Sequence, residues 1–254
     1  ALRPTLNPRA MIAVGIDGCR RGWFYVQLLD PGRYETGVAE ALHNLRDIII
    51  SADLTLIDIP IGLKVSGREE RKCDREARRL LGRRASSVFP VPCRQVLDCR
   101  SYQAGSELNH SQTGRRLSRQ SWGIVPKIAE ADRLIRTLPD KTKLREMHPE
   151  VCFLALNRGQ PMSHNKKRPQ GRAERLALLE RHLPNSGAII DQARAASPKK
   201  DLADDDILDA LVGAVTASHP ESLVSLPAVA ERDELGLVME IVFANPGKAS
   251  MNRA

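Results

Sequence analysis

The order of strand-like and helix-like segments near the start of the chain constrains the fold most. Strand-like runs at 11–16, 23–29 and 34–40 are joined by short turns that contain glycine or proline. Connections this short predict an antiparallel meander. A helical pattern over 41–50 precedes a fourth, buried strand over 54–60. Because that helix permits a crossover, we expect the fourth strand to lie parallel to the first in a mixed α/β sheet.

Beyond residue 62 the pattern changes to helices and loops. Apolar spacing predicts a helix over 68–81. Four of its arginines are expected on the outer side: Arg71, Arg75, Arg78 and Arg79. Segment 82–122 lacks periodicity, which predicts an irregular region, and Pro126 fits the first turn of the next helix.

The C-terminal half alternates again between strands and helices. A strand is predicted over 144–148 and a helix from Pro149. After the glycine- and lysine-containing loop 164–171 comes a leucine-rich helix, then a helix from Asp204 and a closing strand over 236–243.

These elements predict one domain over 11–245, with a largely helical, basic insertion at about 62–143. One domain is expected because the first strand, the fourth strand and the last helix must meet. Residues 1–10 are expected to be an extension before a native start at Met11, or a remnant of expression.

The charge balance favours a polyanionic partner. The 254 residues include 39 Lys and Arg against 31 Asp and Glu, which gives a formal net charge of +8. Segment 64–100 alone holds eleven basic residues and five acids. A local excess of this kind indicates a docking surface for nucleic acid, although many such runs are solvated helix faces.

Cysteine usage and hydropathy exclude other classes. The five cysteines include no C-x-x-C pair and have no nearby paired histidines, so neither a disulfide framework nor a zinc site is indicated. The sequence has no apolar run of about 18 residues, and its first ten residues lack the apolar core of a signal peptide. We expect a soluble, cytoplasmic protein with no membrane partner.

Two acids interrupt apolar strands at their carboxyl ends. Asp17 follows the run I-A-V-G-I, and Asp58 follows L-T-L-I. The pair Asp17-Gly18 also fits a hairpin turn, which would explain Asp17 alone. An isolated acid in a buried strand is costly unless it is paired or bound to a cation, and parallel neighbours would place both acids at one edge.

A third source of acids is the segment D-D-D-I-L-D-A. Asp204 and Asp205 fit the cap and first turn of a helix. Asp209 lies in the apolar body of that helix, and Asp206 shares its face. Gly213 leaves room for the helix to approach the sheet closely. Carboxylates that converge in this way suit a hard cation.

The strand-end G-I-D-G, the strand-end I-D-I-P and the helical D-I-L-D-A resemble the acidic constellation of the ribonuclease H-like superfamily, particularly that of bacterial Holliday-junction resolvases. A closer resemblance is to the family catalogued as domain of unknown function 429. It rests on ordered blocks that span 12–243: G-I-D-G-C-R-R-G-W, L-I-D-I-P-I-G-L, R-x-x-R-x-C-D-R-E-A-R, S-S-V-F-P-V-P, L-S-R-Q-S-W-G-I-V-P-K-I, M-H-P-E-V-C-F and D-D-D-I-L-D-A.

The resemblance implies a ribonuclease H-like mixed sheet of order βββαβ, followed by a helical insertion and a C-terminal acidic helix. It also implies two Mg²⁺ or Mn²⁺ ions that support phosphodiester hydrolysis. The implied metal ligands are Asp17, Asp58, Asp206 and Asp209. Glu150, in H-P-E, is either an additional catalytic acid or a favourable charge at a helix N-terminus.

Basic residues near these motifs are candidates for phosphate contacts with DNA or RNA. They are Arg75, Arg78, Arg79, Arg84, Lys127 and Lys166, the last in the loop K-K-R. Those on the helix 68–81 also fit an ordinary solvated face.

Three functions fit the sequence. The first is a metal-dependent nuclease. The second is an ATP-dependent phosphotransferase of the actin-like or sugar-kinase type, which shares the strand order and strand-end acids but has a second βββαβ half and a glycine-rich phosphate turn. The third is a non-catalytic nucleic-acid-binding protein on a nuclease fold, in which unpaired buried carboxylates would be destabilising.

Overall fold

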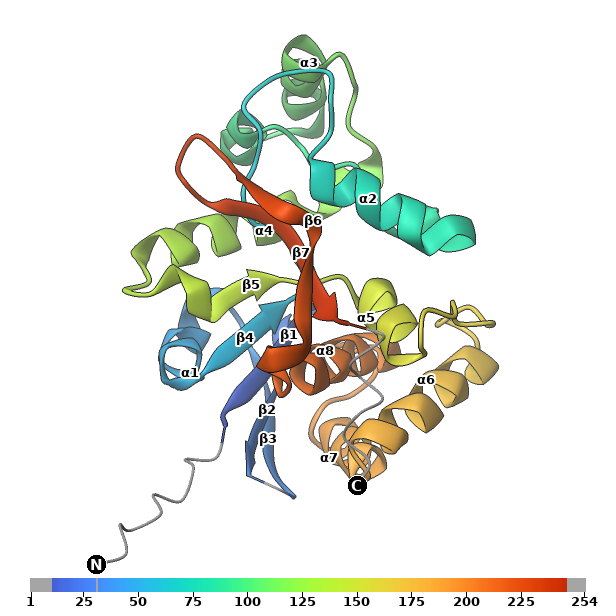
Figure 1. The fold of residues 1–254 in the computed structure, drawn as a ribbon. Coiled ribbons are helices and arrows are strands. Elements are labelled where there is room, and N and C mark those ends of the chain that lie inside the picture. The colour runs from blue at the N-terminus through green and yellow to red at the C-terminus, as the bar shows by residue number, and fades with distance from the viewer. Residues whose placement is uncertain (1–10, 31, 246–254) are drawn as a thin grey trace, which may run out of the picture.

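The centre of the computed structural model, which describes residues 11–30 and 32–245, is a five-stranded mixed sheet (Figure 1). Its strands are β1 (Ala13–Cys19), β2 (Gly22–Asp30), β3 (Arg33–Ala39), β4 (Leu54–Ile57) and β5 (Leu144–Glu146). The spatial order is β3-β2-β1-β4-β5. β1, β2 and β3 pair antiparallel, whereas β4 pairs parallel with both β1 and β5. The predicted meander and crossover are confirmed; the expectation for residues 1–10 lies outside the described residues.

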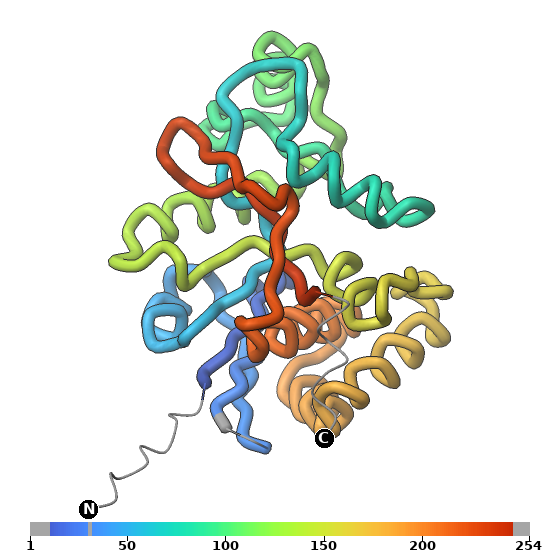
Figure 2. The backbone as a smooth tube through the Cα atoms, viewed as in Figure 1, coloured from blue at the N-terminus to red at the C-terminus, as the bar shows by residue number. Residues whose placement is uncertain are grey.

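Helices connect and cover these strands, and the course of the chain is traced in Figure 2. The crossover holds η1 (Leu42–Leu45) and α1 (Arg46–Ser51). Between β4 and β5 lie α2 (Lys72–Leu81), η2 (Gly82–Ser87), η3 (Arg94–Asp98), α3 (Tyr102–Thr113), α4 (Arg119–Thr137) and η4 (Lys141–Lys143). After β5 come α5 (Pro149–Leu156), α6 (Pro169–His182), α7 (Ser186–Ala196), α8 (Asp204–Ala217), η5 (Pro220–Ser222) and the hairpin β6 (Leu223–Arg232) and β7 (Val238–Ala244). Within the described ranges, no helix is long and apolar enough to cross a membrane.

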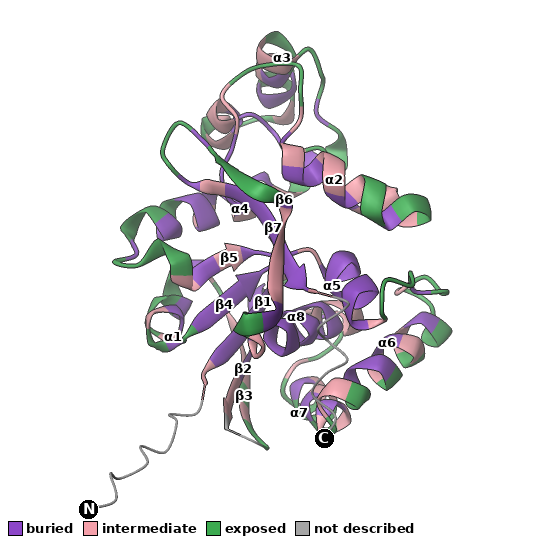
Figure 3. Cartoon of the chain, in the orientation of Figure 1, coloured by how far each residue is buried: buried purple, intermediate pink, exposed green. Residues whose placement is uncertain are grey.

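Alternating residues of β1 belong to two different cores. Val14 and Ile16 pack in a core with Ile128 of α4, whereas Ala13 packs in a core with residues of α8. Side chains along a strand point alternately to opposite faces, so Asp17 lies on the face that α8 covers. β1, β4 and α8 are coloured mainly as buried in Figure 3, whereas β3 at the edge of the sheet has only intermediate and exposed residues.

The approach of α8 to β1 is close because two glycines meet there. A Cβ on Gly15 would lie 2.0 Å from the Ala210 carbonyl oxygen and 2.3 Å from the Ala214 nitrogen. A Cβ on Gly213 would lie 3.3 Å from the Gly15 Cα. The helix backbone therefore rests directly on the strand, as expected at Gly213, and fixes the height of α8 above the sheet.

The structure corrects several local predictions. α4 begins at Arg119 rather than at Pro126, because the Ser118 side chain accepts a hydrogen bond from the Ser121 N–H at 2.9 Å and caps the helix there. Pro126 lies inside α4. The region predicted as irregular contains α3, and both α7 and β6 lie where no element was predicted. Arg71 is 3% exposed and is therefore buried, not on the outer side of its helix.

A candidate metal centre at the carboxyl edge of the sheet

Strand register brings the first two acids together. Ile16 pairs with Ile57 in the parallel ladder, and the Asp58 N–H donates to the Ile16 carbonyl oxygen at 3.0 Å. Asp17 and Asp58 are therefore the next residues along two adjacent strands. Both side chains lie on the face covered by α8, because Leu56, two residues before Asp58, belongs to the core on that face.

The third acid comes from α8. One carboxylate oxygen from each of Asp17, Asp58 and Asp209 lies within 4.8 Å of the other two. Asp209 is 2% exposed, and it shares a face of α8 with Gly213, four residues on. The contact between α8 and β1 thus places this carboxylate over the strand ends. We call these three residues the acidic cluster.

A nearby lysine also reaches the acidic cluster. The Lys166 ammonium, from the segment between α5 and α6, forms an ion pair with Asp209 Oδ2 and lies close enough to Asp17 and Asp58 to interact with their charges. The same three acids raise the pKa of Lys166 above its usual range, although burial of the ammonium opposes this. The ammonium supplies one positive charge against three carboxylates.

Burial and mutual repulsion raise the pKa of each acid in the cluster. The pKa of Asp58 is raised to about 6 by burial, with the Lys166 charge acting in the opposite direction. The pKa of Asp209 is also about 6, for the same causes and through the Asp58 charge. The pKa of Asp17 lies well above its usual range because of burial and the other acids. The acidic cluster therefore lacks enough positive charge to stabilise three ionised carboxylates.

The donor set suits a hard divalent cation. All three donors are carboxylates, the ligands that Mg²⁺ and Mn²⁺ prefer. Asp209 Oδ1 is buried and accepts no hydrogen bond from any residue within 11–30 and 32–245. A buried carboxylate oxygen without a donor is costly, and a bound cation would remove that cost. Asp17 Oδ1, by contrast, accepts the Gly18 N–H at 2.7 Å, so Asp17 also serves the turn.

The fourth predicted ligand lies beside the cluster. Asp206 is in the first turn of α8, where its Oδ2 accepts the Ala203 N–H at 3.0 Å and caps the helix. Burial raises the pKa of Asp206 to about 6. Asp204, expected to cap the helix, instead pairs with Arg194 at 2.9 Å and Lys199 at 3.1 Å. The role of Asp206 as a ligand stays a prediction.

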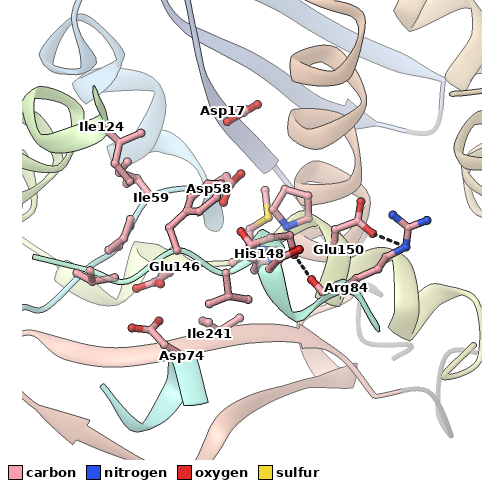
Figure 4. A pocket seen from close by; sticks show the side chains of 18 of the residues that line it. Asp17, Asp58, Ile59, Asp74, Arg84, Ile124, Glu146, His148, Glu150 and Ile241 are labelled. Atoms are coloured by element: carbon pink, nitrogen blue, oxygen red, sulfur yellow. Dashed lines mark hydrogen bonds and ion pairs between the residues drawn. The ribbon is translucent and has the colours of Figure 1, made fainter. Parts of the chain in front are cut away.

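A cavity of about 680 Å³ opens next to the acidic cluster. Asp17 and Asp58 line it together with Glu146, His148 and Glu150 (Figure 4). Burial lowers the pKa of His148, whose Nδ1 lacks a hydrogen-bond partner among the residues that the structure describes. The acids therefore face a space large enough for a small ligand or part of a larger one.

Glu150 is outside the three-acid cluster. It lies in the first turn of α5, as its position after His148 and Pro149 indicates, and is buried. Its Oε1 accepts a hydrogen bond from Arg175, which is itself fully buried, and its Oε2 is 3.6 Å from Arg84 Nε. Two roles were open for Glu150: an additional catalytic acid, or a favourable charge at a helix N-terminus. Both remain predictions, because this carboxylate lines the cavity and is also held by arginines.

The six predicted phosphate-binding residues divide into two groups. Arg84, Lys127 and Lys166 line the cavity. The others lie on α2, outside that lining: Arg75, which pairs with Glu69 at 2.9 Å, Arg78, which pairs with Glu70 at 2.5 Å, and Arg79, which is exposed.

Sequence reasoning missed a buried ionic network at the other side of the cavity. Arg71 donates to both carboxylate oxygens of Glu146, each at 2.7 Å, and to both of Asp74 at 2.7 and 2.9 Å. Glu146 also accepts the Ile61 N–H at 2.7 Å. Glu146 is the last residue of β5. A third acid at the end of a strand is therefore the sequence feature that could have indicated this network. Unlike Asp58, Glu146 is neutralised by arginine.

The sheet order and the acidic cluster define a mixed α/β protein with three carboxylates gathered at the ends of two parallel strands and on a covering helix. A family model described as "Protein of unknown function (DUF429)" matches residues 15–232, and the chain belongs to this family. A search of curated proteins and a search of solved structures each found no match.

Proposed function

We propose that this protein is a metal-dependent nuclease of the ribonuclease H-like type, which hydrolyses phosphodiester bonds of DNA or RNA. The observation that carries the proposal is the convergence of Asp17, Asp58 and Asp209 within 4.8 Å, with a buried Asp209 oxygen that no described residue satisfies. The order of β1, β2, β3, the crossover helix and β4, and the C-terminal acidic helix α8, are also what the resemblance implies.

In this proposal the acidic cluster holds Mg²⁺ or Mn²⁺, with Asp206 as the adjacent candidate ligand. The metal would supply activation of a water molecule and stabilisation of the departing oxygen. The chain itself contributes the fixed position of the donors. Asp17 and Asp58 are held by strand pairing, and Asp209 by the contact of Gly15 with α8.

The basic residues of the cavity would bind the phosphates on either side of the bond to be cut. Arg84 donates to the His164 carbonyl oxygen at 2.6 Å, beside the loop that carries Lys166 and Lys167, and all three basic residues line the cavity. Lys127 lies on α4, with its ammonium 4.5 Å from the centre of the Trp23 ring. Phosphate contacts of this kind position nucleic acid without reading its sequence.

A second candidate is a nucleic-acid-binding protein that does not hydrolyse its ligand. The ion pair between Lys166 and Asp209 favours it, because a lysine can replace a cation as a permanent partner of a carboxylate. In that case the wild-type protein would bind nucleic acid without binding divalent metal.

A cleavage assay tests the leading proposal. End-labelled single strands, duplexes and four-way junctions of DNA and RNA are incubated with the protein in Mg²⁺, Mn²⁺ or EDTA. Cleavage is expected only with metal, and Asp58→Asn should lower its rate by at least about 10². Asp191→Asn, which removes an exposed acid on α7, is the matched control and should cleave like wild type. Metal-independent cleavage, or equal loss in both variants, would contradict the proposal.

A further inference from the structure

The cavity beside the acidic cluster has two ends of opposite chemistry. Ile59 and Ile124 lie at one end and pack, with Val91, on one core. Phe89, two residues before Val91, also lines the cavity, and we call these four side chains the apolar end. Arg84 lies at the other, basic end, where it donates to the His164 carbonyl oxygen at 2.6 Å beside the loop that carries Lys166 and Lys167. Arg83 also lines the cavity, as does Lys127 of α4. In Figure 4, Ile59 and Ile124 lie on one side of Asp58, and Arg84 lies on the other side, with Asp58 between them.

The apolar end is built into the fold. Ile59 directly follows Asp58 just beyond the end of β4, but Asp58 lies beside Asp209 of α8, whereas Ile59 packs in the core that contains Ile128 of α4. Ile59 is 5% exposed and belongs to the core beneath the cavity. Val91 and Ile124 pack against the same core but are only partly buried, so each keeps an apolar surface that faces the cavity.

The segment that carries Phe89 and Val91 is held at both ends. Arg78 Nε–H donates to the Val88 carbonyl oxygen at 3.0 Å, and the Cys93 N–H donates to the Asn109 side chain at 2.8 Å. Prolines at 90 and 92 restrict the backbone between these points. The apolar end is therefore a pre-formed surface.

We propose that this apolar end is a subsite for one unstacked nucleobase, so that the substrate is a single strand or a locally unpaired strand. The inference rests on the proposed function, which places a phosphate at the acidic cluster. A nucleotide joins an apolar ring to an anionic phosphate. The apolar end of the cavity would receive the ring, and the basic end would lie near the phosphates. A base inside a duplex is stacked on both faces and paired, so it reaches such a cavity only after leaving the stack.

Phe89 has the central role in this subsite. Among the four apolar residues it alone has an aromatic ring, which offers a flat surface for a base of any sequence. Ile59, Val91 and Ile124 would contact the base from the remaining sides. The subsite therefore predicts little sequence preference and a strong preference for strands that carry bases over strands that lack them.

Binding in EDTA tests the subsite apart from metal chemistry. Fluorescence anisotropy compares a labelled single-stranded oligonucleotide with an abasic oligonucleotide of equal length and phosphate number. Phe89→Ala and Ile124→Ala should each weaken binding of the normal strand by about tenfold and leave the abasic strand within about twofold of wild type. Phe89→Trp should retain binding of the normal strand. Leu235→Ala, in the turn between β6 and β7, removes an exposed leucine outside the cavity and should change neither.

Thermal melts of each variant confirm that it is folded before its affinity is compared. Equal weakening of both oligonucleotides, or unchanged binding of both in Phe89→Ala and Ile124→Ala, would overturn the subsite. Tighter binding of duplex than of single strand would overturn it as well. None of these results touches the proposed hydrolysis, which fails separately if cleavage is independent of metal and of Asp58.

Discussion

The Lys166 ammonium group is ion-paired with the Asp209 carboxylate inside a group of three acids. Removing either partner of a buried ion pair leaves the other charge uncompensated. In the proposed function, a divalent ion and Lys166 share the same acidic partners. The lysine thereby stabilises the metal-free protein and would move toward a substrate phosphate when metal binds.

The first prediction concerns that competition. Lys166→Met should lower the metal-free stability at pH 7 by about 1–3 kcal/mol, because three carboxylates lose their nearest positive charge. The same variant should gain more stability than wild type when Mn²⁺ is added, since the ion no longer displaces an ammonium. Thermal melts with and without Mn²⁺ measure both effects. Lys167→Met, which removes the exposed neighbouring lysine, is the control and should follow wild type. A smaller Mn²⁺ effect in Lys166→Met than in wild type would show that this lysine assists metal binding.

The second prediction tests the contact that positions Asp209. Gly15→Ala should destabilise the protein by about 3 kcal/mol, because a methyl group 2.0 Å from the Ala210 carbonyl oxygen forces α8 away from β1. Gly123→Ala on the exposed side of α4 is the matched control. A Cβ there meets no described atom within 4 Å beyond its own stretch of helix, and alanine favours a helix, so this variant should be as stable as wild type or slightly more stable. Urea unfolding measures both. Similar stability of the two variants would contradict the close packing of α8 on β1.

The third prediction concerns pH. Folding raises the pKa of Asp58 and of Asp209 to about 6, so the folded protein binds more protons than the unfolded chain between about pH 4 and 6. The metal-free protein should therefore lose stability as pH rises through this window. Mn²⁺ should bind more tightly over the same window, because protons and metal compete for the carboxylates. Urea unfolding across this pH range should show a flatter profile for Asp209→Asn, and an unchanged profile would rule out these pKa shifts.

The fourth prediction separates the basic residues of the cavity from those of α2. The double variant Arg84→Gln/Lys127→Gln should reduce the slope of log Kd for single-stranded nucleic acid against log salt by about one to two. The double variant Arg75→Gln/Arg79→Gln removes the same charge from the surface of α2 and should leave the slope unchanged. Anisotropy titrations over a series of salt concentrations measure both slopes. If instead only Arg75→Gln/Arg79→Gln reduced the slope, the phosphates of the nucleic acid would contact α2 and not the cavity.

The central sheet could be predicted from the sequence because its signals are local. Turn residues and apolar runs define β1, β2 and β3, and the helix before β4 defines the crossover. The meeting of Asp17 with Asp58 then follows from parallel pairing alone.

The missed elements depend on contacts between distant segments. β6 contains Pro227 and reads as a loop, but it pairs as a strand with β7. Arg71 has the spacing of a surface residue, but it is buried against Glu146, which is 75 residues away in the sequence. The ion pair between Lys166 and Asp209 likewise joins a loop to a helix 43 residues away, which no local pattern indicates.

Calorimetric titration of the metal-free protein with Mn²⁺ at pH 7.5 tests the central claim most directly. The account predicts saturable binding to the wild type and its loss in Asp17→Asn, which keeps the size and turn preference of residue 17 but removes its charge. Asp17→Asn should also be more stable than wild type without metal, because one of three mutually repelling carboxylates is gone. Asp191→Asn should bind as the wild type does. Absence of any Mn²⁺ binding to the wild type, or equal binding to wild type and Asp17→Asn, would contradict the metal centre and with it the proposed hydrolysis.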